Sequence, residues 1–81
     1  MRWIDLSEYG MRLYVAVLPN ARALVIDKVS GQHEAAVKAL GFRQRPSGAW
    51  VKAGAGPVNP REYLRAFPKA KIREMEENEY L

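Results

Sequence analysis

The sequence contains no cysteine, so neither a disulfide bond nor a thiolate metal site can stabilise the fold. It has one histidine, His33, which is too little for a histidine metal centre. Ser7, Ser30 and Ser47 do not lie in a recognisable nucleophile turn, and the carboxylates offer no inward-facing pair for acid–base chemistry. We therefore predict no catalytic residue, no metal and no cofactor, and we place His33 at the solvent-exposed start of a helix.

Long apolar runs are also missing, and no basic segment precedes an apolar one at the amino terminus. Such runs form membrane spans and secretion signals, so we predict no membrane partner and a cytoplasmic location. The length of 81 residues fits one domain with just enough core to fold. We assign residues 1–73 to a single α+β domain and residues 74–81 to an acidic, frayed tail.

Alternating hydrophobicity and turn residues predict an α+β fold in the order β-β-α-β-β-α-β. The expected strands cover residues 11–18, 23–29, 42–45, 49–52 and 69–75, and the expected helices cover residues 31–40 and 60–67. This order fits one antiparallel sheet with two helices on one face. Residues 3–6 are compatible with a further short strand, which the predicted order does not include.

Both predicted helices begin at a residue that can act as a cap. Ser30 can cap the first helix, and Gly41 can end it in the left-handed conformation. Asn59 can cap the second helix, because Pro60 suits the first helical position and Glu62 stands where a capping box needs an acid.

Positive charge dominates the second half of the chain. The formal net charge is +4, and residues 34–73 carry nine cations against two acids, Glu34 and Glu62. A basic body suits a polyanionic partner such as nucleic acid, or an acidic protein surface. An ordinary solvated surface explains the same charge equally well.

Several of these cations surround a tryptophan in a predicted hairpin. A four-residue turn from Arg45 to Gly48 places Arg43 opposite Trp50, with Arg45 and Lys52 on the same face. A flat aromatic ring flanked by cations can stack bases and hold phosphates. A shift of one residue would instead turn Trp50 into the core, because strand faces alternate, and the sequence leaves both registers open.

A second basic group follows in the last predicted strand. Lys69, Lys71 and Arg73 are expected to face outward, while Ala70 and Ile72 face the core. We place this strand in the same sheet as the hairpin, so that the two basic groups form one patch. The predicted residues for binding nucleic acid or a protein partner are Arg43, Arg45, Trp50, Lys52, Lys69, Lys71 and Arg73.

Residues 36–51 contain a motif in which a helix ends at a glycine and a short turn leads to a tryptophan. The motif is carried by Ala36, Leu40, Gly41, Phe42, Trp50 and Val51. It resembles a small domain of unknown function found beside primases, relaxases and antirestriction modules in polyvalent plasmid and phage proteins. That family usually has a Trp-Asp pair after the glycine, where this chain has Arg43-Gln44, and a lysine near the second tryptophan, where it has Gly48-Ala49. The resemblance implies a mobile-element origin and a DNA-transaction setting, and it supplies no catalytic residue.

Together these observations predict a non-catalytic, nucleic-acid-binding accessory protein from a phage or plasmid. The alternative is a small inhibitor of host defence, comparable to anti-CRISPR proteins, whose basic surface docks on an acidic or nucleic-acid-binding protein. A purely structural interaction module is a third interpretation. The sequence leaves open the choice between DNA and RNA, any base preference and the oligomeric state.

Overall fold

The computed structural model describes residues 2–54 and 58–74. The strands in these segments are β1 (Arg2–Asp5), β2 (Arg12–Leu18), β3 (Ala21–Asp27), β4 (Arg43–Gln44), β5 (Trp50–Ala53) and β6 (Lys71–Glu74). The α-helices are α1 (Glu34–Ala39) and α2 (Pro60–Ala66), and two short 3-10 helices are η1 (Ser7–Tyr9) and η2 (Gly31–His33). The predicted α+β class is confirmed, and the elements from β2 to β6 follow the predicted order.

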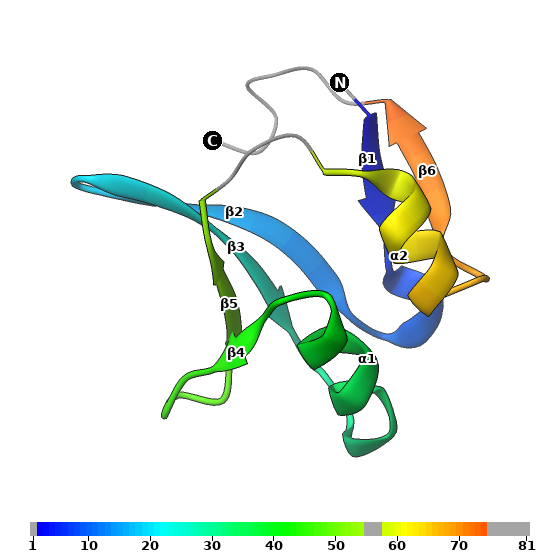
Figure 1. The fold of residues 1–81 in the computed structure, drawn as a ribbon, viewed down its shortest axis with the longest axis horizontal. Helices are drawn as coiled ribbons and strands as arrows, with labels where there is room; N and C mark the ends of the chain where they lie inside the picture. The colour runs from blue at the N-terminus through cyan, green and yellow to red at the C-terminus, as the bar shows by residue number, and fades with distance from the viewer. Residues whose placement is uncertain (1, 55–57, 75–81) are drawn as a thin grey trace.

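The strands form two antiparallel sheets instead of the single predicted sheet. One sheet has the order β2-β3-β5-β4, and the other pairs β1 with β6, so that Arg2 lies opposite Glu74. Figure 1 shows the β1-β6 pair at one end of the molecule, beside α2, and the β2-β3 hairpin reaching toward the other end. Because β1 takes β6 as its partner, the last strand does not join the sheet of the β4-β5 hairpin.

Of the acidic tail predicted for residues 74–81, the structure describes only Glu74. Glu74 is the last residue of β6, and its carboxylate lies 3.9 Å from Arg2 Nε. Residues 75–81 lie outside the described residues.

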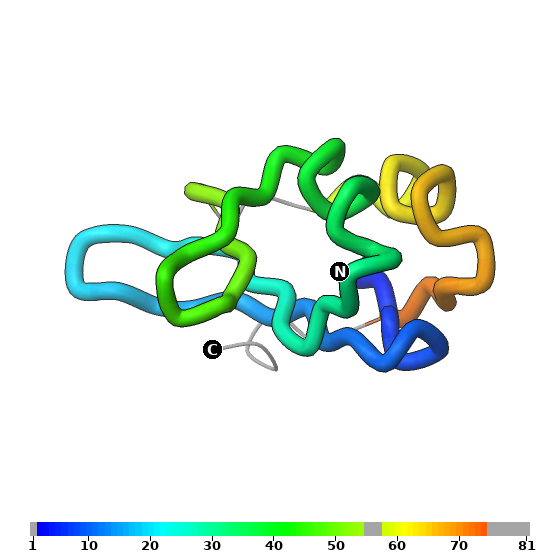
Figure 2. The backbone as a smooth tube through the Cα atoms, turned by 90° about the horizontal axis from the view of Figure 1, so that it is seen from below, coloured from blue at the N-terminus to red at the C-terminus, as the bar shows by residue number. Residues whose placement is uncertain are grey.

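One hydrophobic core joins the two sheets and the two helices. Val37 of α1 and Tyr63 of α2 are buried in it, together with Leu24 and Ile26 of β3. In Figure 2 both helices lie on the upper side of the molecule, and β2 and β3 run along the lower side. The two helices therefore lie on the same side of the molecule, with α2 against β1 of the two-stranded sheet.

One face of the four-stranded sheet carries no helix among the described residues, and we call it the helix-free face. Residues directly opposite each other on antiparallel strands share a face, so the strand register defines its members. They are Arg12, Tyr14, Ala16, Leu18, Ala21, Ala23, Val25, Asp27, Arg43, Val51 and Ala53. Ala23 and Val25 are buried at its centre, and exposed side chains such as Arg12, Arg43 and Ala53 surround them.

The β2-β3 hairpin extends beyond the rest of its sheet. Within β3 residues 23–26 pair with β5, and the Arg22 carbonyl accepts one further hydrogen bond, from the Gly54 N–H at 3.1 Å. Among the described residues no strand pairs with the tip beyond Arg22 on that side. Val17 and Leu18 are consequently 55% and 51% exposed, although Val17 shares its face of the strand with the buried Leu13 and Val15.

Helix α1 ends as predicted at Gly41, which has a φ of 100°. Its N–H donates to the Lys38 carbonyl at 3.0 Å. The Lys52 ammonium donates to the Leu40 carbonyl at 3.0 Å, so β5 supplies a side chain that satisfies the last turn. A Cβ at position 41 would lie 3.2 Å from Lys52 Cε, so glycine both adopts the left-handed backbone and makes room for the lysine.

We expect Gly41→Ala to lower the free energy of unfolding by about 1–2 kcal/mol, because a left-handed backbone strains any residue with a Cβ. Gly31 is the matched control, since its φ is not positive and no atom lies within 4 Å of the position a Cβ would take. Gly31→Ala should therefore leave stability within about 0.5 kcal/mol of the wild type. Urea unfolding of both variants measures the difference, and equal stability would contradict the described helix end.

Helix α2 begins as the sequence predicts. The Asn59 side chain accepts a hydrogen bond from the Arg61 N–H at 3.1 Å, and Pro60 occupies the first helical position. The predicted cap of the first helix is wrong, because Ser30 makes no side-chain hydrogen bond to the helix backbone. Its hydroxyl lies 3.0 Å from Nδ1 of His33 instead.

Candidate nucleic-acid interface

The turn of the β4-β5 hairpin sets which side chains share a face. The Gly48 N–H donates to the Arg45 carbonyl at 2.8 Å, and the Arg45 N–H donates to the Ala49 carbonyl at 2.8 Å. Gly48 has a φ of 96° and adds a third residue to the loop, a combination typical of a type I turn followed by a left-handed glycine. Arg45 therefore pairs with Ala49, whereas the predicted turn paired it with Gly48.

This one-residue difference corrects the predicted arrangement around Trp50. Arg43 lies opposite Val51, and Gln44 lies opposite Trp50. Trp50 is 7% exposed and packs in the core, so the buried alternative is the correct one and the ring offers no stacking surface. Because strand faces alternate, Arg43 lies on the helix-free face, whereas Trp50 and Lys52 lie on the core face.

Of the predicted cations in the hairpin, Lys52 has a structural role. It is half-buried, and its ammonium holds the end of α1 through the Leu40 carbonyl. Arg43 and Arg45 are exposed, and the Arg43 guanidinium donates one hydrogen bond to the Phe42 carbonyl at 3.0 Å. Within residues 2–54 and 58–74, the N–H groups of these two guanidiniums other than that one make no side-chain hydrogen bond, and a guanidinium has five N–H donors.

Arg43 and Arg45 line a hollow of about 460 Å³ together with Arg22 and Lys52. We call it the arginine hollow. Its other lining residues are Leu18, Ala21, Ala23, Gly41, Val51, Ala53 and Gly54, so small apolar groups separate the cations and no acidic side chain lines it. Arg22 was missed from the sequence because the tip of the β2-β3 hairpin is far from Arg43 along the chain.

An aromatic side chain lies on the helix-free face as well. Tyr14 is half-buried, and the Arg12 guanidinium stacks over its ring at 4.5 Å from the centroid. Arg12 also contacts Asp27, with 3.2 Å between guanidinium nitrogen and carboxylate oxygen. Tyr14 was not singled out from the sequence, although the alternation in β2 already places it on the same face as Arg12.

The second predicted basic group lies elsewhere. Lys71 and Arg73 belong to β6, in the other sheet, and Figures 1 and 2 both show β6 far from β4. The Lys71 ammonium lies 3.4 Å from a Glu8 carboxylate oxygen, and the Arg73 guanidinium lies 3.5 Å from Asp5. These two cations are thus neutralised locally, and the predicted single patch with the hairpin is wrong.

The neighbouring residues follow the expected pattern except at Ile72. Lys69 is exposed, and its backbone N–H donates to the Tyr9 hydroxyl at 2.8 Å. Ala70 is buried as predicted, but Ile72 is 48% exposed. Ile72 of β6 pairs with Ile4 of β1, which is buried. All four residues of β6 are exposed, so β1 is the strand of this pair that packs in the core.

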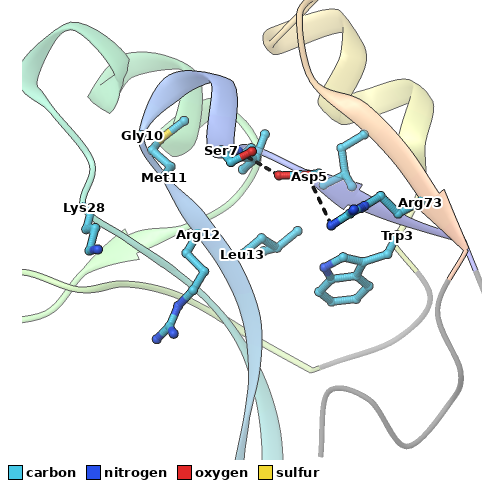
Figure 3. Close-up of a pocket in the computed structure, with 11 residues that line it drawn as sticks. Trp3, Asp5, Ser7, Gly10, Met11, Arg12, Leu13, Lys28 and Arg73 are labelled. Atoms are coloured by element: carbon cyan, nitrogen blue, oxygen red, sulfur yellow. Dashed lines mark hydrogen bonds and ion pairs between the residues drawn. The ribbon is translucent and has the colours of Figure 1, made fainter.

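A second hollow, of about 430 Å³, lies where β1 approaches the start of β2. Figure 3 shows Trp3 and Leu13 in it, with Asp5 directed at Ser7 and at Arg73. The Ser7 N–H donates to Asp5 Oδ1 at 2.9 Å, and this bond and the Ser7 hydroxyl hold the pKa of Asp5 below its usual value, with a smaller contribution from Arg73. This carboxylate is therefore an ionised structural group and a poor proton donor.

The single histidine packs against aromatic rings. His33 is half-buried, which corrects its predicted solvent-exposed position, and its ring centroid lies 5.3 Å from that of Tyr9 and 5.8 Å from that of Phe67. Both contacts are edge-on, a favourable geometry for aromatic pairs. His33 therefore packs η2 against Tyr9 of η1 and against Phe67 at the end of α2.

Within residues 2–54 and 58–74, no three potential ligands from histidine, aspartate and glutamate come together as a metal site. No helix described there is long and apolar enough to cross a membrane. Comparisons with protein-family models, with curated proteins and with solved structures gave no match for this chain. The similarity of residues 36–51 to the plasmid and phage domain therefore stays a prediction.

Proposed function

We propose that this protein binds nucleic acid without catalysis, through the arginine hollow and the helix-free face around it. The observation that carries this proposal is the lining of the hollow, to which the described residues contribute four cations and no acid. Three of them, Arg22, Arg43 and Arg45, are exposed arginines, whose planar guanidinium groups bind phosphate oxygens in pairs.

The surroundings of the hollow support a polymeric ligand. The hollow lies at the edge of the sheet, because Arg43 belongs to the helix-free face whereas Arg22 and Lys52 occupy positions of the opposite face. On the helix-free face, Arg43 is accompanied by Tyr14 and Arg12, which present an aromatic ring and a stacked guanidinium. Bases stack on such groups, and arginines beside them contact the backbone. Tyr14 takes the role that the sequence assigned to Trp50. The setting we propose is the cytoplasm of a host cell, in DNA transactions of a phage or plasmid.

Fluorescence anisotropy of labelled single- and double-stranded oligonucleotides tests this proposal. We expect binding that weakens as salt increases, because each neutralised phosphate releases counterions. Arg43→Glu combined with Arg45→Glu should weaken binding by at least about tenfold on all sequences alike.

The matched control is Lys38→Glu combined with Lys69→Glu, which changes the net charge equally. Lys38 and Lys69 are exposed, and neither lines the arginine hollow. This control should weaken binding by less than about threefold, since it acts only through long-range electrostatics. Equal loss in both double variants would show a general charge effect. No binding by the wild type at low salt would refute nucleic-acid binding and favour the alternative, an inhibitor that docks on an acidic or nucleic-acid-binding protein.

A further inference from the structure

The outer edge of β2 is a strand edge that no other described strand covers. In the four-stranded sheet β2 is an end strand, and among the described strands it pairs with β3 alone. Its seven residues, Arg-Leu-Tyr-Val-Ala-Val-Leu, contain no lysine and no proline. Lysine, proline and short length are the usual means by which edge strands avoid pairing with other chains, and β2 uses none of them.

The backbone of this edge presents N–H and C=O groups that can pair with a second strand. Leu18 lies opposite Ala21 across a two-residue turn, which makes that pair the first hydrogen-bonded one. Antiparallel pairing alternates, so the N–H and C=O groups of Leu13, Val15 and Val17 point away from β3. Near Leu13 the edge is close to β1, since Trp3 and Leu13 line the same hollow. The accessible part of the edge is therefore residues 14–18.

We propose that two copies of this chain associate through this part of β2, antiparallel and centred on Ala16. In this register Val15 of each copy pairs with Val17 of the other, so the outward-pointing backbone groups meet. The same register places Tyr14 of each copy beside Leu18 of the other. It covers both exposed apolar residues of the hairpin tip, Val17 and Leu18.

Charge favours a second copy as the occupant. Residues 14–18 carry no charge, and the one charged residue of β2, Arg12, is paired with Asp27 at 3.2 Å. Two copies of a basic chain can therefore approach along this edge without opposing like charges. The assembly closes at two, because the opposite edge of the sheet, β4, has only two residues and carries Arg43. The result is one continuous sheet that joins the two helix-free faces.

Disulfide trapping tests the register directly, because the natural chain has no cysteine. Paired Ala16 residues would have Cα atoms about 4.5 Å apart, at a pair without mutual hydrogen bonds. That separation lies in the range of about 4.4–6.8 Å that a disulfide spans. We expect Ala16→Cys to form a covalent dimer under mild oxidation, at least about tenfold faster than the control Ile72→Cys, an exposed position on β6. Equal rates for the two variants would overturn the proposal.

Sedimentation velocity over a range of concentrations tests the association itself. The wild type should show a concentration-dependent monomer–dimer equilibrium, and Val17→Lys should weaken it at least about tenfold. Ile72→Lys introduces the same charge at an equally exposed residue and should leave the equilibrium unchanged. Circular dichroism checks that each variant is folded, and Leu18→Lys replaces Val17→Lys if the latter unfolds. A wild type that stays monomeric throughout, or equal effects of the β2 and β6 variants, would overturn the proposal.

Discussion

Trp50→Ala is expected to lower the free energy of unfolding by about 3–5 kcal/mol, the usual cost of deleting a large buried aromatic side chain. Trp50 is 7% exposed and belongs to the same core as Ile26, which lies opposite it on β3. A domain of this size has roughly 5–15 kcal/mol of stability in total, so the variant should be partly unfolded at moderate temperature. Urea unfolding followed by far-ultraviolet circular dichroism measures the loss without relying on tryptophan fluorescence.

The matched control is Tyr14→Ala, which removes an aromatic side chain from the opposite face of the same sheet. Tyr14 is only half-buried, so its loss should cost clearly less than that of Trp50. The two variants should also differ in function. Tyr14→Ala should weaken single-stranded binding while the protein remains folded, whereas Trp50→Ala should weaken binding only to the extent that it unfolds the chain. A stable, folded Trp50→Ala variant would contradict the hairpin register.

Alkaline destabilisation through Tyr63 is the second large effect that we expect. Tyr63 is 2% exposed, and burial, with a smaller contribution from Glu62, raises the pKa of its hydroxyl from 10.0 to about 12. The folded state therefore holds this proton more tightly than the unfolded state. The resulting stabilisation is complete below pH 10, the unfolded pKa, and is lost as the pH rises toward 12, the folded pKa. Two pKa units correspond to about 2–3 kcal/mol.

Tyr63→Phe isolates this contribution from the other groups that titrate at high pH. Unfolding free energies of the wild type and the variant should be compared at pH values below 10 and near 12. The wild type should lose about 2–3 kcal/mol more than the variant over this interval. Parallel pH profiles for the two proteins would show that the Tyr63 hydroxyl ionises equally easily in both states.

Local sequence signals predicted the elements that depend on local chemistry. The Asn59-Pro60 helix start and the Gly41 helix end are where the sequence placed them, because a cap or a left-handed glycine acts within a few residues. The alternation over residues 11–18 predicted a strand, and β2 spans Arg12–Leu18. Burial within β2 changes from Val15, which is buried, to Val17, which is 55% exposed, because it depends on how far β5 extends beside β3.

The hairpin shows how a small local difference changes a candidate site. Arg43 and Arg45 were predicted correctly as exposed cations, but one residue in the loop decides whether they share a face with Trp50. A Pro-Ser-Gly turn is compatible with a two- or a three-residue loop, and the left-handed Gly48 selects the longer one. The sequence therefore identified the charges of the site and not its aromatic partner.

The division into two sheets was not predictable from local pattern. Pairing of β1 with β6 joins residues that are almost the whole described chain apart, and it depends on tertiary packing. Trp3 and Ile4 are adjacent and both buried, so β1 lacks the alternation that reveals a strand with one exposed face. Because the predicted order left out β1, the strand expected over residues 69–75 was assigned to the sheet of the β4-β5 hairpin.

The β1-β6 ladder also has a consequence for how the chain acquires its structure during synthesis. The β2-β3 and β4-β5 hairpins need only neighbouring residues, so they can form while translation continues. In contrast, β1 is made before the other described strands, and β6, its partner among them, is complete only when residues 71–74 leave the ribosome. During that interval Trp3 and Ile4 are exposed to other chains and to chaperones, and closing this long loop should be among the last steps of folding.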